Sequence, residues 1–246
     1  MRFGKRCIRL DSWCAGFLIP AVAVVLWGRA LLAWGRAPIW GTPSLQFIPW
    51  RVWGWHVMRA TGQLPWWNSD LGLGAPLLAN LQSAWFYPPT WVLFVLAAWR
   101  GVEAMAWGHG VLVVLHLLLA AAGMVALGRE LGWRAPATGI AALAYTLSGY
   151  LATRSAIFLS MNAAAAWVPW ILWAARRWVR TAALRDAVQV GLFLALQTLA
   201  GHAQTSWYTG LLLVGWLAFW LRATGVPRAP RARGRELLGI AVMAAV

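Results

Sequence analysis

The sequence predicts an all-α, polytopic helical membrane protein with about six full transmembrane helices, a truncated seventh, and a large outer loop that contains short interfacial helices. Three observations carry this prediction. Of 246 residues, 61% are apolar and 11% are charged, and the mean hydropathy is +0.63. Soluble domains are about 45–50% apolar and about 25% charged. Long apolar runs recur along the chain, and arginines gather between them. These observations exclude an ordinary soluble domain.

Six apolar runs are interpreted as helices that cross a hydrocarbon core about 30 Å thick. They lie at 14–34, 107–128, 136–153, 161–175, 187–203 and 205–221, and a seventh begins near 237 and stops at Val246. A helix that ends inside the hydrocarbon leaves backbone groups unsatisfied. We therefore expect one membrane domain over 1–246, which is the N-terminal part of a longer protein or a fragment.

Charge placement predicts the orientation. The formal net charge is +15, from 21 basic and six acidic residues. Under the positive-inside rule, the basic residues before the first run place the N-terminus in the cytoplasm. Fifteen basic residues then fall on the cytoplasmic side, namely Arg2, Lys5, Arg6, Arg9, Arg129, Arg134, Arg176, Arg177, Arg180, Arg185, Arg222, Arg228, Arg231, Arg233 and Arg235. The charge thus indicates topology in a bacterial cytoplasmic (inner) membrane, with membrane lipid and no nucleic acid as partner.

The segment 35–106 is predicted to be an extracytoplasmic loop. Within it, 47–61 combines tryptophans with Arg51, His56 and Arg59, a pattern typical of an amphipathic helix in the interface. The apolar stretch 88–99 is too short to cross the membrane. We interpret it as an interfacial or re-entrant helix, because a crossing there would place every later arginine cluster on the outer side.

Several ordered blocks carry a resemblance. They are Gln46-Phe47-Ile48-Pro49-Trp50, Gly62 to Pro65 with Trp67-Asn68, Leu71 to Pro76, Ala79-Asn80-Leu81-Gln82-Ser83 running to Tyr87-Pro88-Pro89, Leu115-His116 with Gly123-Met124, Ala144 to Tyr150, Trp167-Val168-Pro169, and Leu199 to Gln204. With these blocks the chain resembles the YfhO-like family of bacterial membrane proteins, which is similar to the GT-C class of membrane glycosyltransferases. The resemblance implies a GT-C-like fold. It also implies transfer of a sugar from a polyprenyl-phosphate donor to a cell-envelope glycan or lipid acceptor on the outer face.

The catalytic carboxylate is the point at which this chain departs from that family. The family usually has an Asp shortly before the Gln-x-x-Pro element, whereas 40–45 contains no acid here. Asp70 and Glu103 are the two outer acids, so they are the catalytic candidates as bases for an acceptor hydroxyl. Each also has a structural interpretation. Asp70 suits a turn, and Glu103 suits an ion pair or a helix start.

Further polar residues are candidates for substrate binding. Arg51 and Arg154 suit a lipid phosphate, although interfacial arginines also snorkel toward water. His202 and Gln204, on the short outer turn between the fifth and sixth predicted helices, suit sugar or phosphate, or bond their own turn. Arg29, inside the first helix, is expected to need a partner or a wet cleft. The remaining candidates, from the outer loop, are Gln46, Asn68, Asn80, Gln82 and Tyr87.

Cofactors and activity stay open at this stage. Cys7 and Cys14 form no metal pattern, and His109 and His116 have no carboxylate or cysteine beside them. A divalent metal is therefore neither indicated nor excluded. The competing hypothesis is a non-catalytic or degenerate membrane protein that binds a lipid carrier or a partner subunit. A transporter is a third class, and the inverted repeats that would favour it are not visible.

Overall fold

The protein is an all-helical bundle. The computed structural model describes residues 4–36 and 41–223, with side chains from residue 16 onward. The seventh apolar segment, Arg2 and the basic residues from Arg228 on lie outside what is described, and Lys5, Arg6 and Arg9 are described only as part of the α1 backbone. The helices are α1 (Gly4–Leu32), α2 (Ile48–Thr61), α3 (Trp91–Arg100), α4 (Ala104–Glu130), α5 (Ala135–Thr146), α6 (Gly149–Arg154), α7 (Leu159–Thr181), α8 (Leu184–Leu199) and α9 (Ala203–Ala223).

Short elements complete the segment between α1 and α4. A π-helical turn η1 (Pro43–Phe47) leads into α2. An antiparallel pair of two-residue strands, β1 (Trp67–Asn68) and β2 (Ala75–Pro76), forms a hairpin. Two 3₁₀ turns follow, η2 (Leu81–Ser83) and η3 (Pro88–Thr90). The interfacial helices predicted over 47–61 and 88–99 correspond to α2 and to η3 with α3.

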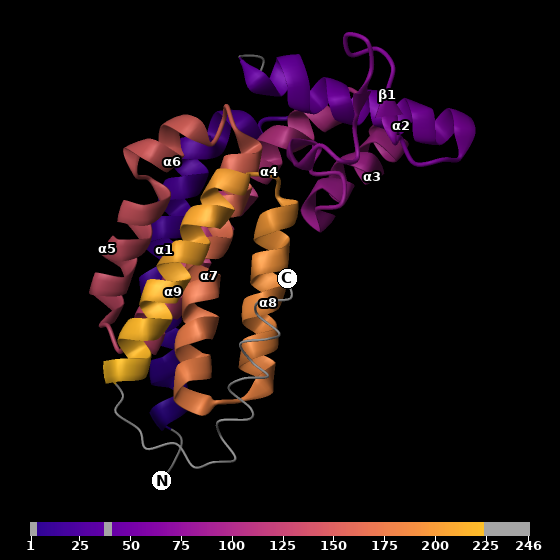
Figure 1. Ribbon diagram of the computed structural model, residues 1–246. Helices are drawn as coiled ribbons and strands as arrows, with labels where there is room; N and C mark the ends of the chain where they lie inside the picture. The colour runs from indigo at the N-terminus through magenta and orange to yellow at the C-terminus, as the bar shows by residue number, and fades with distance from the viewer. Residues whose placement is uncertain (1–3, 37–40, 224–246) are drawn as a thin grey trace.

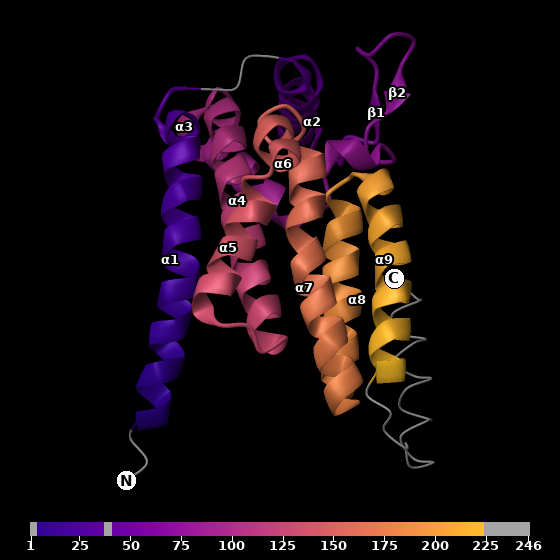
Figure 2. The ribbon, with the colours of Figure 1, turned by 90° about the vertical axis from the view of Figure 1, so that its left-hand side faces the viewer.

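The bundle is built around α4 and α7, which pack on each other along their lengths. α1 and α5 pack against α4, and α8 and α9 pack against α7. Figures 1 and 2 show these helices side by side. Small residues on α7, among them Ala163, Ala164, Ala174 and Ala175, are fully buried in this core. Their size lets the neighbouring helices approach closely.

The two ends of the bundle differ. One end carries α2, α3, α6 and the hairpin, as Figure 2 shows, and the other carries the α4–α5 and α7–α8 connections and the end of α9. Those connections hold the arginine clusters that the sequence predicts for the cytoplasmic side. The bundle therefore separates an arginine-rich end from an end built by residues 41–103.

One predicted crossing differs from the structure. The run 136–153 is broken into α5 and α6, because Ser148 accepts a hydrogen bond from the Leu151 amide and starts a new helix there. With 12 residues, α5 is about 18 Å long. Arg29 also differs from expectation, since it is exposed on the last turn of α1 rather than enclosed.

Within the described part of the chain, α4 alone combines the length and the apolar composition of a membrane-crossing helix. Gly16–Leu32 of α1 forms a shorter apolar stretch. Large apolar side chains nevertheless lie on the outside of several other helices. Examples are Ile19 of α1 at 64% exposed, Ile140 of α5 at 67% and Val214 of α9 at 68%.

Candidate functional site

A cavity of about 500 Å³ lies between α5, α6, α7 and α9. The residues that line it come from the α5–α6 break and from the first turns of α9, which are at the end opposite the arginine clusters. They are Tyr145, Ser148, Tyr150, Leu151, Ala165, Val168, Gln204, Thr205, Tyr208, Thr209 and Leu212. The lining combines aliphatic side chains with hydroxyl and amide groups.

The tyrosines mark this cavity most clearly. The chain has four tyrosines against 21 tryptophans, and Tyr145, Tyr150 and Tyr208 all line it. The Tyr145 hydroxyl donates to the Ala165 carbonyl at 2.8 Å, and Gln204 Nε2 donates to the Tyr208 hydroxyl at 2.9 Å. The Tyr208 proton is thus left to donate to a ligand. No charged side chain is among the lining residues, so the cavity offers apolar area and neutral hydrogen-bonding groups.

His202 lies at the edge of this cavity and caps α9. Its Nδ1 accepts from the Thr205 amide at 3.2 Å and lies 2.7 Å from the Thr205 hydroxyl, and Thr205 itself lines the cavity. Partial burial lowers the pKa of His202 below its ordinary value. A neutral imidazole suits this acceptor role, because protonation of Nδ1 would remove the cap.

The turn that carries His202 lies directly against the η2 turn of the segment between α1 and α4. Gly201 has φ +88°, and a Cβ there would stand 2.1 Å from the Leu81 carbonyl oxygen. Only glycine fits such a contact. The turn between α8 and α9 and the η2 turn therefore hold each other in place. Arg154 follows Tyr150 by four residues on α6, which puts both side chains on one helix face, and it is exposed.

The outer-loop candidates are placed elsewhere. Asp70 is exposed in the hairpin, where its two carboxylate oxygens accept from Trp53 Nε1 and from the Ser69 hydroxyl, both at 2.9 Å. Its amide donates to Asn68 Oδ1 at 3.0 Å, so Asn68, which is buried, forms the turn. The structure thus places Asp70 as a hydrogen-bond acceptor that ties the hairpin to α2.

Glu103 lies apart from Asp70. It is exposed at the start of α4, in a smaller cavity of about 210 Å³ that Trp34, Arg100 and Trp107 also line. In Figure 2 the start of α4 and the hairpin stand on different sides of the bundle's end. Neither acid lines the larger cavity. The structure therefore does not bring the two predicted catalytic carboxylates together.

Three further candidates from this segment, Gln46, Asn80 and Gln82, either bond within their own turn or are exposed to solvent. Asn80 Oδ1 accepts from the Gln82 amide at 3.1 Å and caps η2, which leaves the Gln82 side chain exposed. Gln46 is exposed within η1. None of the three lines the larger cavity.

Tyr87 belongs to a buried hydrogen-bond chain. Trp167 Nε1 donates to the Tyr87 oxygen at 2.8 Å, and that hydroxyl lies 2.8 Å from His116 Nε2. His116 Nδ1 is 2.6 Å from the Leu112 carbonyl, so Nδ1 carries the proton and Nε2 accepts from Tyr87. Burial raises the pKa of Tyr87, which keeps its hydroxyl protonated. This chain fixes the outer loop to α4 and α7.

Arg51 is buried at 2% exposure between η1, α2 and α4. Its Nη1 lies 3.5 Å from Nδ1 of the equally buried His109, and its Cζ lies 5.9 Å from the centre of the Phe47 ring. Burial lowers the pKa of Arg51 to about 10, so the guanidinium stays charged at neutral pH. It is the most deeply buried charged group on the outer-loop side.

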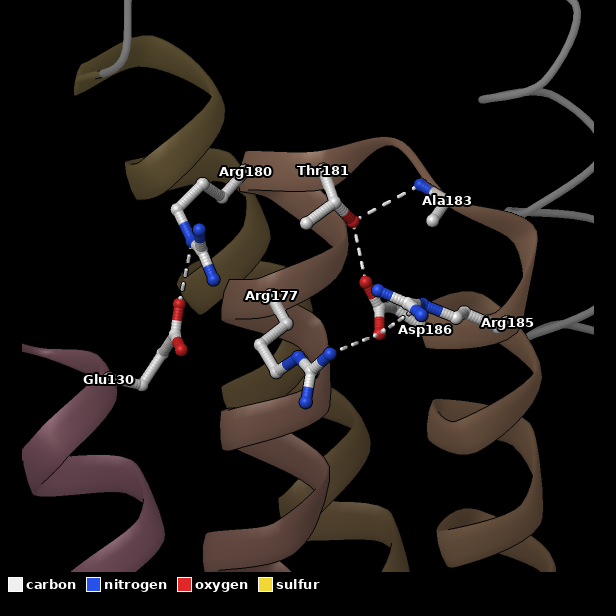
Figure 3. Close-up of polar contacts among 7 residues, drawn as sticks. All are labelled: Glu130, Arg177, Arg180, Thr181, Ala183, Arg185 and Asp186. Atoms are coloured by element: carbon white, nitrogen blue, oxygen red, sulfur yellow. Dashed lines mark hydrogen bonds and ion pairs between the residues drawn. The ribbon is translucent and has the colours of Figure 1, made fainter. Parts of the chain in front are cut away.

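The arginine-rich end holds a second polar cluster, which Figure 3 shows. Asp186, fully buried in the first turn of α8, pairs with Arg177 at 3.3 Å and accepts from the Thr181 hydroxyl at 2.5 Å. Arg185 lies 3.8 Å from the same carboxylate, and Arg180 pairs with Glu130 at 2.9 Å. These contacts join α7 to α8 and to α4, which is a structural role.

Sequence reasoning missed the tyrosines of the cavity as a group. Their rarity beside so many tryptophans was the available signal. In the described segments, no group of three or more His, Cys, Asp or Glu side chains could hold a metal ion. Comparison with known protein families, with curated proteins and with solved structures finds no match to this chain.

Proposed function

We propose that the chain is a polytopic membrane protein whose outer end is formed by residues 41–103. Large apolar side chains on the outward faces of α1, α5 and α9 support this proposal, because extensive exposed apolar surface marks contact with a membrane or another protein. The arginine clusters of the α4–α5 and α7–α8 connections support the orientation, with that end in the cytoplasm of a bacterium.

The cavity between α5, α6, α7 and α9 is the proposed binding site for a lipid-linked saccharide. This cavity is the observation that carries the proposal. Its aliphatic side chains suit a hydrocarbon chain, and its tyrosine and glutamine groups suit sugar hydroxyls, which both donate and accept. The uncharged lining suits the neutral sugar of such a lipid rather than its phosphate. His202 supplies a polar group at the edge of the cavity. Arg154, which lies on the same face of α6 as Tyr150, supplies another.

Sugar transfer is the second candidate function. In this version the donor is a polyprenyl-phosphate sugar, and Asp70 deprotonates an acceptor hydroxyl of a cell-envelope glycan or lipid. One observation favours it: Asp70 is exposed to water on the loop whose η2 turn contacts the α8–α9 turn. The engaged oxygens of Asp70 and its absence from the cavity lining favour binding without transfer.

One assay tests both candidates. The protein is reconstituted in nanodiscs and titrated with polyprenyl-phosphate glucose, with polyprenol as the comparison ligand. Tyr208→Phe removes one hydroxyl from the cavity, so we expect roughly three- to tenfold weaker binding of the glycosylated lipid. Trp207→Phe, on the neighbouring exposed position, is the matched control and is expected to bind like wild type.

The same samples report on transfer through release of the sugar. If Asp70 is the base, Asp70→Asn loses transfer of the sugar while its binding stays within twofold of wild type. Equal binding of wild type and Tyr208→Phe would contradict the cavity proposal. Binding without sugar release under any divalent metal would favour the non-catalytic role.

A further inference from the structure

The guanidinium of Arg51 lacks a counter-charge. The ion pairs among the described side chains join Arg177, Arg180 and Arg185 to acids at the opposite end of the bundle. The two acids of this segment, Asp70 and Glu103, are both exposed and neither pairs with Arg51, and Asp70 is engaged by Trp53 and Ser69. Arg51 Nε is buried without a hydrogen-bond partner. A full positive charge is therefore enclosed where the described part of the chain provides no anion.

The side chains around Arg51 stabilise its positive charge only weakly. The contact to His109 is 3.5 Å long, at the limit of a hydrogen bond, and the Phe47 ring contributes only a cation–π contact. Because a guanidinium can only donate, His109 Nδ1 accepts and Nε2 carries the proton. That Nε2 is also buried without a partner. Two neighbouring side chains thus present unused donors, and neither presents an acceptor.

The backbone beside Arg51 is unusual as well. The π-helical turn η1 ends at Phe47, and Arg51 follows one helical turn later on α2. π-helical turns are rare, and they occur frequently at functional sites. Here the turn places the Phe47 ring over the guanidinium. This second observation is independent of the charge.

We propose that Arg51, held by His109, forms a binding site for a phosphate-class oxyanion, supplied by a lipid head group or by free phosphate. A guanidinium matches such oxygens with paired N–H groups, and a buried charge binds its counter-ion strongly once that ion is present. The inference goes beyond the proposed function, because it requires neither the cavity nor a sugar.

Thermal unfolding of the detergent-purified full chain in phosphate-free buffer tests the proposal. Replacing a buried unpaired charge by an apolar group of similar volume is neutral or stabilising. Arg51→Met should therefore have a Tm equal to or above that of wild type. Adding ligand at about a hundred times its Kd should raise the Tm of wild type by roughly 5–10 °C and leave Arg51→Met unchanged. Arg59→Met, on the same helix but exposed beside Trp55, is the control and should respond like wild type.

Three ligands separate the sources of the anion. Inorganic phosphate, polyprenyl phosphate and polyprenol are added in parallel. A shift with polyprenyl phosphate alone assigns the site to a lipid head group, and a shift with inorganic phosphate as well assigns it to the oxyanion itself. An unfolded or strongly destabilised Arg51→Met would overturn the proposal, since Arg51 would then have a partner within the chain. An equal shift in wild type and Arg51→Met, or no shift with any ligand, would overturn it too.

Discussion

At the scale of single residues, the capping role of His202 predicts that the stability of the protein depends on pH. Its Nδ1 caps α9, and burial lowers its pKa below the ordinary 6.5. The unfolded chain therefore binds the proton more readily, so the cap contributes stability above that pH and loses it as the pH falls through the folded pKa. Losing an N-cap costs about 1 kcal/mol, or roughly 2–4 °C in Tm for a chain of this size.

The measurement is Tm at pH 7.5 and at pH 5. His202→Asn keeps a capping acceptor but does not titrate, so its Tm should fall less than that of wild type between these values. His56, which is exposed on α2, gives the control His56→Asn, whose pH response should match wild type. The same acid-induced loss in His202→Asn would show that another group controls it.

Single residues also show what a sequence can and cannot provide. That Asp70 and Asn68 lie in a turn follows from their residue types, and the structure finds Asn68 as the turn acceptor. The hydrogen bond from Trp53 to the Asp70 carboxylate could not be predicted, because the two residues meet only when the hairpin folds onto α2. The burial of Arg51 has the same origin. An interfacial helix was predicted, but not which of its faces would pack on α4.

At the scale of elements, the ion pairs that join α7 to α8 predict that replacing Asp186 lowers the stability of the protein. Asp186 is fully buried and held by Arg177 and Thr181. Replacing it with Ala leaves Arg177 without its partner, at a cost of about 3–5 kcal/mol, or roughly 10 °C in Tm. Glu130→Ala breaks the more exposed pair with Arg180 and should cost about 0–1 kcal/mol. Equal Tm losses in the two variants would contradict the assigned role of Asp186.

The helix boundaries were largely predictable, because apolar runs end at arginines and turn-forming residues. The α5–α6 break was not, since Ser148 and Gly149 lie inside a run whose composition stays apolar. This break matters for the site. Tyr145 and Tyr150 stand on either side of it, and both line the cavity together with residues from the first turns of α9.

At the scale of the whole molecule, hydropathy predicted an all-helical fold, which the structure confirms, and the arginines of the α4–α5 and α7–α8 connections lie at the same end of the bundle (Figure 2). The grouping of site residues was beyond sequence reasoning. His202, Gln204 and Arg154 lie in or near one cavity, whereas Asp70 and Glu103 lie away from it. Distances between loops depend on how long helices pack, which composition does not encode.

The proposed membrane topology predicts which positions are reachable from outside the cell. Leu73 in the hairpin and Ala203 at the start of α9 lie toward the proposed outer end, and Leu184 at the start of α8 lies at the arginine-rich end; all three are exposed. In a chain with Cys7→Ser and Cys14→Ser, single cysteines at Leu73 and Ala203 should react with a membrane-impermeant maleimide on intact cells. A cysteine at Leu184 should react only after permeabilisation.

If α3 crossed the membrane, Leu73 and Ala203 would fall on opposite sides, so labelling of one without the other would disprove the topology. Equal labelling of all three positions in intact cells would contradict the proposal that the protein spans a membrane.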